Sequence, residues 1–582
     1  MNKPLLGSLV AATLLLGDAS AATMYERFEA MEKEIQALQS ELSGLKAEKA
    51  AAEEKPEARD EDEDDEDETE DEDADETEDD EESEEDEDDD EEMDVNEAIE
   101  DLQESVHELT RATSGSHLKF GVDLRTSYDN VRYEMAGTTV TNYNAFDPAT
   151  GLYLPTGTTS QVDKKQKNNS LFTNRLWINM DWAANENISF TGQLAYNKTY
   201  GARFNNTGSG AGFENFDWFV NENANGDGNV RVKSAYWFYR NQTFLGADIP
   251  WTFSLGRRPS TNGHLVNMRD DDPAASPSGH TINVEFDGLS SKFGLEKLTG
   301  VEGMYIKLCA GQGVSSANEK FSSTPYANNA DGFEVDDVHL GGFIFVPYDD
   351  GQYSVGTQFY GATNLPGQNM DQTGTPFAGP SFNPQFGALT GLTPMGNLYS
   401  GSMYIMLNGI GDEWSDFLDD TTFFVSGAIS RTDPDKGTDQ FGQEKAMLGS
   451  TDMENGYSYW IGLNMPSLIS EDGRFGLEFN HGSKYWRSIT YGEDTMIGSK
   501  VATRGNAYEA YFTEPLLEDV LSLQIRYTYI DYDWTGSNGF FGNASGTPMR
   551  IDDILSNPLT AANAGNVVDK AQDIRAYIRY RF

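Results

Sequence analysis

The residues whose side chains are best suited to bind or orient a solute in this chain of 582 amino acids lie in one segment, residues 257–280. Its charged and titratable members are Arg257, Arg258, His264, Arg269, Asp270, Asp271 and Asp272. Guanidinium and carboxylate groups that oppose one another across a narrow, water-filled passage would order water and favour polar solutes over apolar ones. The segment therefore predicts the constriction of a channel. The alternative is that these charges pair with one another on an external loop and contribute little.

Catalytic and metal-binding motifs are missing from the sequence. It contains neither a Gly-x-Ser-x-Gly turn nor a His-Glu-x-x-His helix. A stretch that starts like a calcium loop at Asn221 has Val232 where the twelfth position requires a glutamate. The single cysteine, Cys309, excludes an internal disulfide framework and a multi-cysteine metal site, and the six histidines show no metal-ligand spacing. We therefore expect no enzymatic activity, no metal site and no cofactor.

The elements that must position the charged segment are best marked at the carboxyl terminus, where residues 571–582 alternate strictly between apolar and polar side chains. The apolar members are Ile574, Ala576, Ile578, Tyr580 and Phe582. Strict alternation predicts a strand with one oily face and one polar face. An edge strand of a soluble domain would alternate in the same way, but an aromatic end is typical of a bacterial outer-membrane barrel. We interpret these five residues as a signal for the barrel-assembly machinery.

The spacing of the other strand-like segments supports a barrel. Sixteen candidate strands begin near residues 118, 172, 188, 230, 251, 283, 301, 336, 353, 401, 420, 456, 473, 502, 521 and 571. Long connections such as 201–229 and 259–282 alternate with short ones such as 184–187 and 347–352. Short turns on one side and long loops on the other are typical of outer-membrane barrels. We predict an all-β fold over residues 117–582, a transmembrane antiparallel β-barrel of about 16 strands with its short turns in the periplasm.

The two faces of these strands should meet different surroundings, because the oily face contacts outer-membrane lipid and the polar face lines water. Basic side chains on the polar face, which we expect in the lumen, are Arg125, Arg175, Lys233, Lys307, Arg526, Arg575 and Arg579. In a wet lumen such groups are solvated or pair with acidic neighbours. Tryptophans near strand ends are expected at the lipid headgroup level, namely Trp182, Trp251, Trp486 and Trp534.

The amino-terminal part has a different organisation. Residues 1–21 read as a secretory signal peptide, and no later run is apolar and long enough for a transmembrane helix. Heptad spacing predicts a coiled coil over residues 22–50 and a second coiled-coil helix over 95–114, although a single amphipathic helix is the alternative for the first. The acidic residues 51–94 between them predict a disordered spacer, which could also gather cations or a basic partner. Because an even strand number puts both barrel ends on the short-turn side, we place this arm in the periplasm.

The charge of the chain is concentrated. Of the net −57, about half comes from residues 60–92, in which 29 of 33 residues are acidic. From His117 onward, 33 lysines and arginines face 53 aspartates and glutamates, a balance of −20. This sign argues against nucleic acid as a partner, since such binding depends on basic groups that neutralise phosphates. It also predicts a mild cation preference for a channel.

Several segments together resemble a known family. They are FTNRLWINMDW at 172–182, LGADIPWTFSLGRRPSTNG at 245–263, HTINVEFDG at 280–288, GMYIKLC at 303–309 and GGFIFVPYDDGQYS at 341–354. They look like an uncharacterised family of bacterial outer-membrane β-barrel, porin-like proteins that begin with a signal peptide and a short coiled coil. The resemblance implies the fold, the outer-membrane location and a porin activity, without ligand residues. The long acidic insert departs from the shorter helical start of that family.

These observations lead to a functional hypothesis. We expect an outer-membrane porin, too wide to be filled by its own wall side chains, that lets small hydrophilic solutes diffuse passively. Residues 257–280 form its third long loop, and in sixteen-stranded porins the third loop folds into the lumen as the constriction. The coiled coil favours a homotrimer. The alternative function is a structural anchor, in which the periplasmic coiled coil tethers the membrane to the cell wall or to an envelope partner.

Overall fold

A computed structural model describes residues 118–141, 145–147, 152–154, 159–201, 230–318, 320–327, 336–367, 393–411, 414–438, 444–490, 495–517, 520–536 and 548–582. The signal peptide, the two coiled-coil segments and the acidic spacer predicted for residues 1–114 lie outside these ranges and stay predictions. Within the described ranges, no helix combines the length and apolar character that crossing a bilayer requires.

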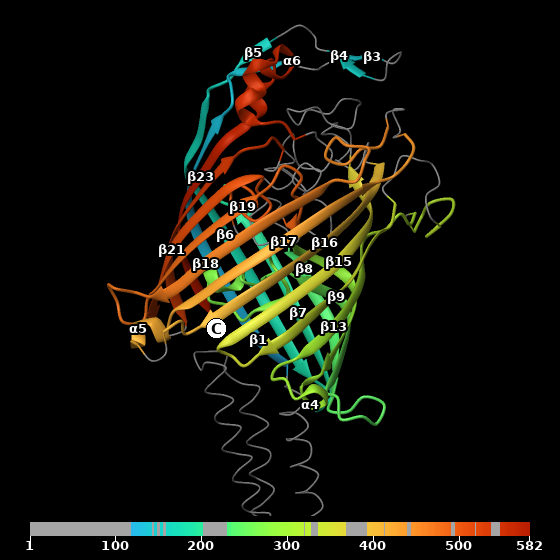
Figure 1. Ribbon diagram of the computed structural model, residues 1–582, viewed down its shortest axis with the longest axis vertical. Helices are drawn as coiled ribbons and strands as arrows, with labels where there is room; N and C mark the ends of the chain where they lie inside the picture. Colours follow the sequence, from blue (N-terminus) through green and yellow to red (C-terminus); the bar gives the residue numbers. More distant parts are fainter. Residues whose placement is uncertain are drawn as a thin grey trace, which may run out of the picture. The chain divides into compact units, whose positions relative to one another are not determined.

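Sixteen antiparallel strands form a closed β-barrel, which confirms the predicted fold (Figure 1). Their bounds are β1 (Leu118–Met135), β6 (Lys165–Ala183), β7 (Ile188–Thr199), β8 (Val230–Asn241), β9 (Trp251–Ser260), β12 (Ile282–Gly294), β13 (Tyr305–Val314), β14 (Val338–Asp349), β15 (Tyr353–Gly367), β16 (Thr393–Asn408), β17 (Thr422–Pro434), β18 (Asn455–Pro466), β19 (Arg474–Gly482), β21 (Gly505–Leu517), β22 (Leu521–Tyr532) and β23 (Val568–Arg581).

Short elements decorate the connections between these strands. They are β2 (Thr139–Thr141), β3 (Ala145–Asp147), β4 (Leu152–Leu154), β5 (Thr159–Gln161), β10 (Gly263–His264), η3 (Asn267–Asp270), β11 (Ala275–Ser278), α4 (Glu296–Thr299), α5 (Asp416–Asp419), β20 (Ile489–Thr490), η5 (Ile551–Ser556), α6 (Pro558–Ala561) and η6 (Ala564–Asn566). Figure 1 shows α4, α5 and the carboxyl terminus at the same end of the barrel, the end with the short connections.

The last strand closes the barrel against the first. β23 pairs antiparallel with β1 from Asp123 opposite Arg581 to Met135 opposite Val568. The amide of Val122 donates to the carbonyl of Phe582 at 2.8 Å, so the pairing continues to the final residue. Closure removes the unpaired edges that an open sheet would leave in lipid.

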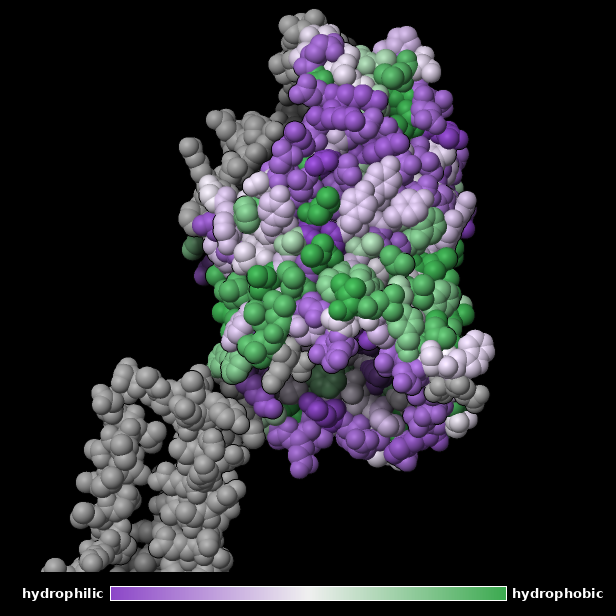
Figure 2. Space-filling view, turned by 90° about the vertical axis from the view of Figure 1, so that its left-hand side faces the viewer, coloured by the Kyte–Doolittle hydropathy of each residue, from purple (hydrophilic) through white to green (hydrophobic). Residues whose placement is uncertain are grey.

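The alternation of β23 has the predicted orientation. Ile574 and Ile578 are 45% and 50% exposed on the outer face, whereas Arg575 and Arg579 are buried on the inner face. Figure 2 shows, on the face in view, a belt of hydrophobic side chains around the lower part of the barrel, with hydrophilic side chains above and below it. The belt is what a barrel needs to match the hydrocarbon core of a membrane.

Two strands begin well before their predicted starts. β6 begins at Lys165 and β16 at Thr393, where the sequence predicts starts near 172 and 401. In β6 the first six residues are polar and exposed on both faces. These six residues lie beyond the apolar belt, so they need no apolar face toward lipid. The sequence there therefore does not alternate between apolar and polar residues, and this is why the strand start was not predicted.

Candidate functional site in the barrel lumen

The third long connection folds into the barrel. We call residues 261–281, between β9 and β12, the first inward loop; it contains β10, η3 and β11. Its side chains and backbone contact the inner faces of strands on the opposite wall: Asn464 of β18 donates to the carbonyl of Met268 at 3.4 Å, and Gln524 of β22 donates to that of Arg269 at 2.7 Å. The loop turns at Asp271, whose backbone is left-handed with φ of 52°. It therefore crosses the lumen.

Carboxylates at the tip of the first inward loop meet arginines of the closing strand. The Nη2 of Arg579 lies 2.9 Å from Asp272 Oδ1, and its Nη1 donates to the carbonyl of Asp270 at 2.8 Å. Tyr577 donates its hydroxyl to Asp270 Oδ1 at 3.0 Å, and Arg581 Nη1 lies 3.0 Å from Asp272 Oδ1. These contacts fix the tip against β23, near the end of the barrel where the chain ends.

The same arginine continues the network into the wall. Arg579 also pairs with Asp123 of β1, whose carboxylate lies 3.1 Å from Arg175 Nη2 of β6. Arg175 in turn stacks its guanidinium 3.6 Å above the ring of Trp177. Opposite charges on three neighbouring strands and the loop tip thus compensate one another inside the barrel, as buried charges must.

A second ionic cluster lies around Glu509 of β21. The Nζ of Lys500 lies 2.5 Å from Glu509 Oε1 and 2.5 Å from Glu478 Oε2 of β19. Arg269 of the first inward loop approaches Glu509 Oε1 at 3.3 Å, and Thr528 of β22 donates to its Oε2 at 2.7 Å. One carboxylate therefore holds two different loops to the wall.

Lys500 belongs to a second inward loop that the sequence did not reveal. We give this name to residues 483–504, between β19 and β21, whose residues 491–494 are not described. Its β20 pairs in parallel with β12, Ile489 opposite Ile282. Arg487 and Arg504 are fully buried in it, and burial lowers the pKa of each guanidinium to about 9.

Apolar residues are the sequence signal that could have identified this second loop. Trp486, Ile489, Ile497 and Val501 recur through a stretch that would be polar if it lay outside. Trp486 was predicted at the lipid headgroups, and that prediction is wrong, because its side chain is 1% exposed and its Nε1 donates to the carbonyl of Val501. The apolar contacts of the loop interior outweigh the interfacial preference of tryptophan.

Two histidines are part of the first inward loop. His280 is fully buried, with Nδ1 2.8 Å from Ser426 Oγ and Nε2 2.9 Å from Ser458 Oγ, and burial lowers its pKa to about 3. Trp460 and Trp486 present their rings edgewise to it, each at 5.7 Å. His264 stacks on Tyr404 at 5.3 Å, and burial also lowers the pKa of its imidazole. The rings pin the loop to β16, β17 and β18.

The sequence-predicted constriction residues divide into three groups. Arg269, Asp270 and Asp272 lie together in the lumen contacts described above, with His264 and the exposed Asp271 on the same loop. Arg258 lies on the inner face of β9, where it hydrogen-bonds to Ser254 and covers the ring of Tyr236 at 4.8 Å. Arg257 does not join them: it shares the outer face of β9 with Leu255 and lies 3.9 Å from the exposed Asp287, because neighbouring residues of a strand point to opposite faces.

The seven predicted lumen residues all lie on the inner face of the wall. Arg125, Arg175, Lys233, Arg526, Arg575 and Arg579 are buried and Lys307 is half-buried. Lys233 Nζ lies 2.6 Å from Glu285 Oε1, and Arg575 Nε pairs with Asp129 at 2.5 Å. The described residues contain no cluster of three or more histidine, cysteine, aspartate or glutamate side chains placed to hold a metal ion.

One family model and several solved structures are similar to this chain. A family model described as "Protein of unknown function (DUF3373)" matches residues 165–582. Among solved structures, in-vitro folded OmpT of Vibrio cholerae is similar with a TM-score of 0.37 and 10% identity, covering 80% of this chain and 97% of that one. An anion-selective porin from Comamonas acidovorans has a TM-score of 0.37 and 10% identity, covering 80% and 99%. OmpF of Salmonella typhi, in complex with daunomycin, has a TM-score of 0.35 and 9% identity, covering 79% of this chain and 97% of that one. No curated protein matches the chain.

Proposed function

The chain belongs to the DUF3373 family of proteins of unknown function, and we propose that it is an outer-membrane channel through which small hydrophilic solutes diffuse. The observation that carries the proposal is a closed barrel of sixteen strands with an apolar belt outside and charged side chains inside. A barrel of this size is wide enough for an aqueous passage, whereas one of eight strands is filled by its own wall. An apolar belt suits lipid, and charged inner faces suit water.

The two inward loops supply the constriction in this proposal. Arg269, Asp270 and Asp272 of the first loop and Lys500 of the second stand opposite wall residues of both signs. Side chains held by such contacts keep their positions while solutes pass, which a selective narrowing requires. A homotrimer and a periplasmic position for the amino-terminal arm complete the proposal, supported by the heptads and the shared end of the two barrel termini.

The sign of the selectivity follows from where the charges lie. The balance of −20 over residues 117–582 predicts a mild cation preference, and that prediction is untested. The buried charged side chains inside the barrel argue in the other direction: among the described residues, and without Arg257 on the outer face of β9, they comprise ten arginines and lysines against seven aspartates and glutamates. Because a passing ion responds most to the charges nearest its path, we propose a preference for anions.

Planar-bilayer recording on the purified full-length protein tests the function. We expect stepwise, ohmic conductance in KCl and, under a salt gradient, a reversal potential of the sign set by chloride. If a folded, strand-rich preparation inserts into the bilayer but gives no conductance steps, the proposed channel function is wrong. A reversal potential set by potassium would restore the cation preference and leave the channel itself intact.

A further inference from the structure

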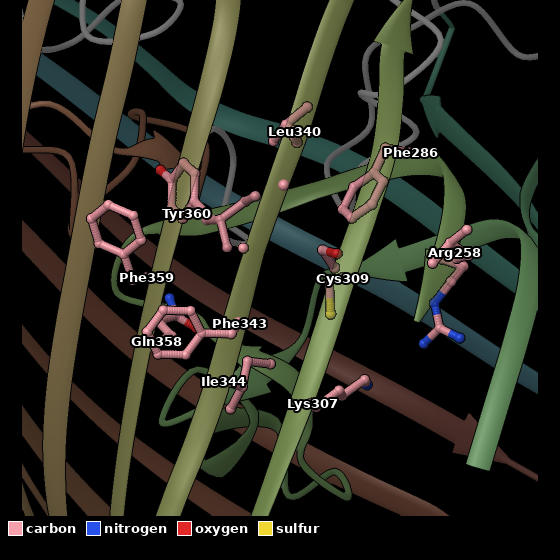
Figure 3. A pocket seen from close by; sticks show the side chains of 15 residues that line it. Arg258, Phe286, Lys307, Cys309, Leu340, Phe343, Ile344, Gln358, Phe359 and Tyr360 are labelled. Atoms are coloured by element: carbon pink, nitrogen blue, oxygen red, sulfur yellow. The ribbon is translucent and has the colours of Figure 1, made fainter. Parts of the chain in front are cut away.

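A pocket opens where the β9–β12 hairpin leaves the barrel wall. β12 pairs with β13 only from Asp287 to Gly294, but it stays paired with β9 as far as Val284. The freed residues Ile282, Val284 and Phe286 bend inward and pack with side chains of β14, β15 and β16. The space between this bent hairpin and β13–β15 is a pocket of about 50 Å³ (Figure 3).

The body of the pocket is apolar. Phe286, Leu340 and Tyr360 line it, and each is less than 10% exposed. A cavity needs roughly 10–15 Å³ for each water it holds, and water also needs polar partners, which an apolar wall does not offer. The space therefore suits a few methylene groups better than a chain of waters.

Basic groups lie on one side of the pocket. Arg258 of β9 and Lys307 of β13 both line it; in Figure 3 they lie to the right of Cys309 and below it, whereas Phe359 and Tyr360 of β15 lie to its left. Lys292 stands directly opposite Lys307 in the β12–β13 register, with its Nζ 3.8 Å above the ring of Tyr305. Like charges at directly opposite positions repel, so a bound anion would stabilise this arrangement.

We propose that this pocket binds a short-chain monocarboxylate, with its carboxylate at Arg258 and Lys307 and its alkyl chain against Phe286 and Leu340. An arginine recognises a carboxylate through charge-assisted hydrogen bonds. Contact of an alkyl chain with the apolar wall adds binding affinity that an inorganic anion does not gain. The inference deepens the proposed function by naming a solute class for the channel. Binding itself needs no conductance, so the two can fail separately.

Calorimetric titration of the purified, detergent-solubilised full-length protein with hexanoate tests the site. We expect saturable binding that Arg258→Gln and Lys307→Gln each weaken at least tenfold. Arg431→Gln removes an exposed arginine of β17 and should leave binding unchanged. Hexanamide, which lacks the charge, and acetate, which lacks the tail, should each bind at least tenfold more weakly than hexanoate.

Cys309 localises the ligand, since it is the single cysteine of the chain and lines the pocket. Hexanoate should slow the labelling of its thiol by a methanethiosulfonate reagent at least fivefold, and hexanamide should not. Absence of saturable hexanoate binding to the folded wild type overturns the proposal, as does binding that both pocket variants leave unchanged. If the thiol resists labelling even without ligand, the titration with the two variants decides. Conductance in KCl without hexanoate reports separately on the channel.

Discussion

The Nη2 of Arg579 lies 2.9 Å from Oδ1 of Asp272, so the strand that closes the barrel also holds the tip of a loop 307 residues earlier in the sequence. Barrel closure and the position of the first inward loop are thereby linked through one guanidinium, which also pairs with Asp123 of the first strand. The ion pairs that hold the tip of the first inward loop can therefore form only once β23 is in place.

Asp272→Asn should loosen the loop tip. In this variant Arg579 still pairs with Asp123, and Arg581 still pairs with Asp271. We therefore expect the free energy of unfolding to fall by about 1–3 kcal/mol, as for the loss of one hydrogen bond to a charged group. The single-channel conductance should become larger and noisier. The temperature at which the folded band disappears on gels and bilayer recording measure the two effects. Asp271→Asn is the matched control, because that side chain is 73% exposed. Equal effects of the two variants would contradict the tethering role of Asp272.

His280 should make stability depend on pH. Its pKa is about 3 in the folded protein and near 6.5 when unfolded, so the unfolded chain binds the extra proton between these values. The contribution of the neutral His280 side chain to the free energy of unfolding is therefore fully present above about pH 6.5 and is lost as the pH falls toward 3. The loss reaches about 4–5 kcal/mol, because each unit by which the two pKa values differ corresponds to about 1.36 kcal/mol. Denaturant unfolding at pH 7.5, 5.5 and 4.5 should show a shallower decline for His280→Gln than for the wild type.

The exposed His339 provides the control for this experiment. His339→Gln should follow the wild-type pH dependence, since carboxylates that titrate in acid are the same in both proteins. If His280→Gln and His339→Gln decline in parallel, the buried imidazole does not limit stability in acid.

The wall could be predicted from the sequence because each lipid-facing position imposes a local demand for an apolar side chain. Ile574, Ile578 and Tyr580 repeat every second or fourth residue, and that repeat is visible without the fold. The contacts that fix the inward loops leave no such trace. Arg269 and Glu509 are 240 residues apart, and Asp272 and Arg579 are 307 apart, so no local pattern pairs them. The position of the first loop was predictable from its order in the chain, but its partners were not.

Ile578→Lys should impair insertion of the barrel. The side chain is 50% exposed on the outer face of β23, and a lysine on the lipid face costs about 2–4 kcal/mol near the bilayer midplane. Folding into lipid vesicles, followed by gel mobility, should show a smaller folded fraction. Leu555→Lys makes a similar change at an exposed residue of η5, in the connection between β22 and β23, and should fold like the wild type. Equal folded fractions would place Ile578 outside the lipid belt.

Removal of the amino-terminal arm separates the channel from the anchor hypothesis. The barrel of residues 118–582 closes by its own β1–β23 pairing, so a chain lacking residues 22–116 should insert and conduct with unchanged unit conductance. If the protein is a channel, the deletion leaves unit conductance, solute uptake and envelope attachment unchanged, whereas an anchor loses envelope attachment. Recording in bilayers measures the conductance, and attachment of the outer membrane to the cell wall in cells that carry the shortened chain separates the two hypotheses.

Lys500 should hold the second inward loop through buried charge. Its side chain is 2% exposed between Glu478 and Glu509, and removal of one member of such a cluster costs about 3–5 kcal/mol, because it leaves carboxylates buried without their cation. Lys500→Met should therefore destabilise the protein by that order and raise the conductance as the loop leaves the lumen.

The pair of Lys297 with Asp248 is the matched control for Lys500. Its Nζ–Oδ1 distance of 2.7 Å is similar, but the two side chains are 49% and 69% exposed, and exposed pairs contribute about 0–1 kcal/mol. Lys297→Met should leave stability and conductance near wild type. If Lys500→Met behaves like Lys297→Met in unfolding and in bilayers, burial adds nothing to the Lys500 contacts. The second inward loop must then be held by other contacts, such as the apolar packing of Val501 and the hydrogen bond that Trp486 donates to its carbonyl.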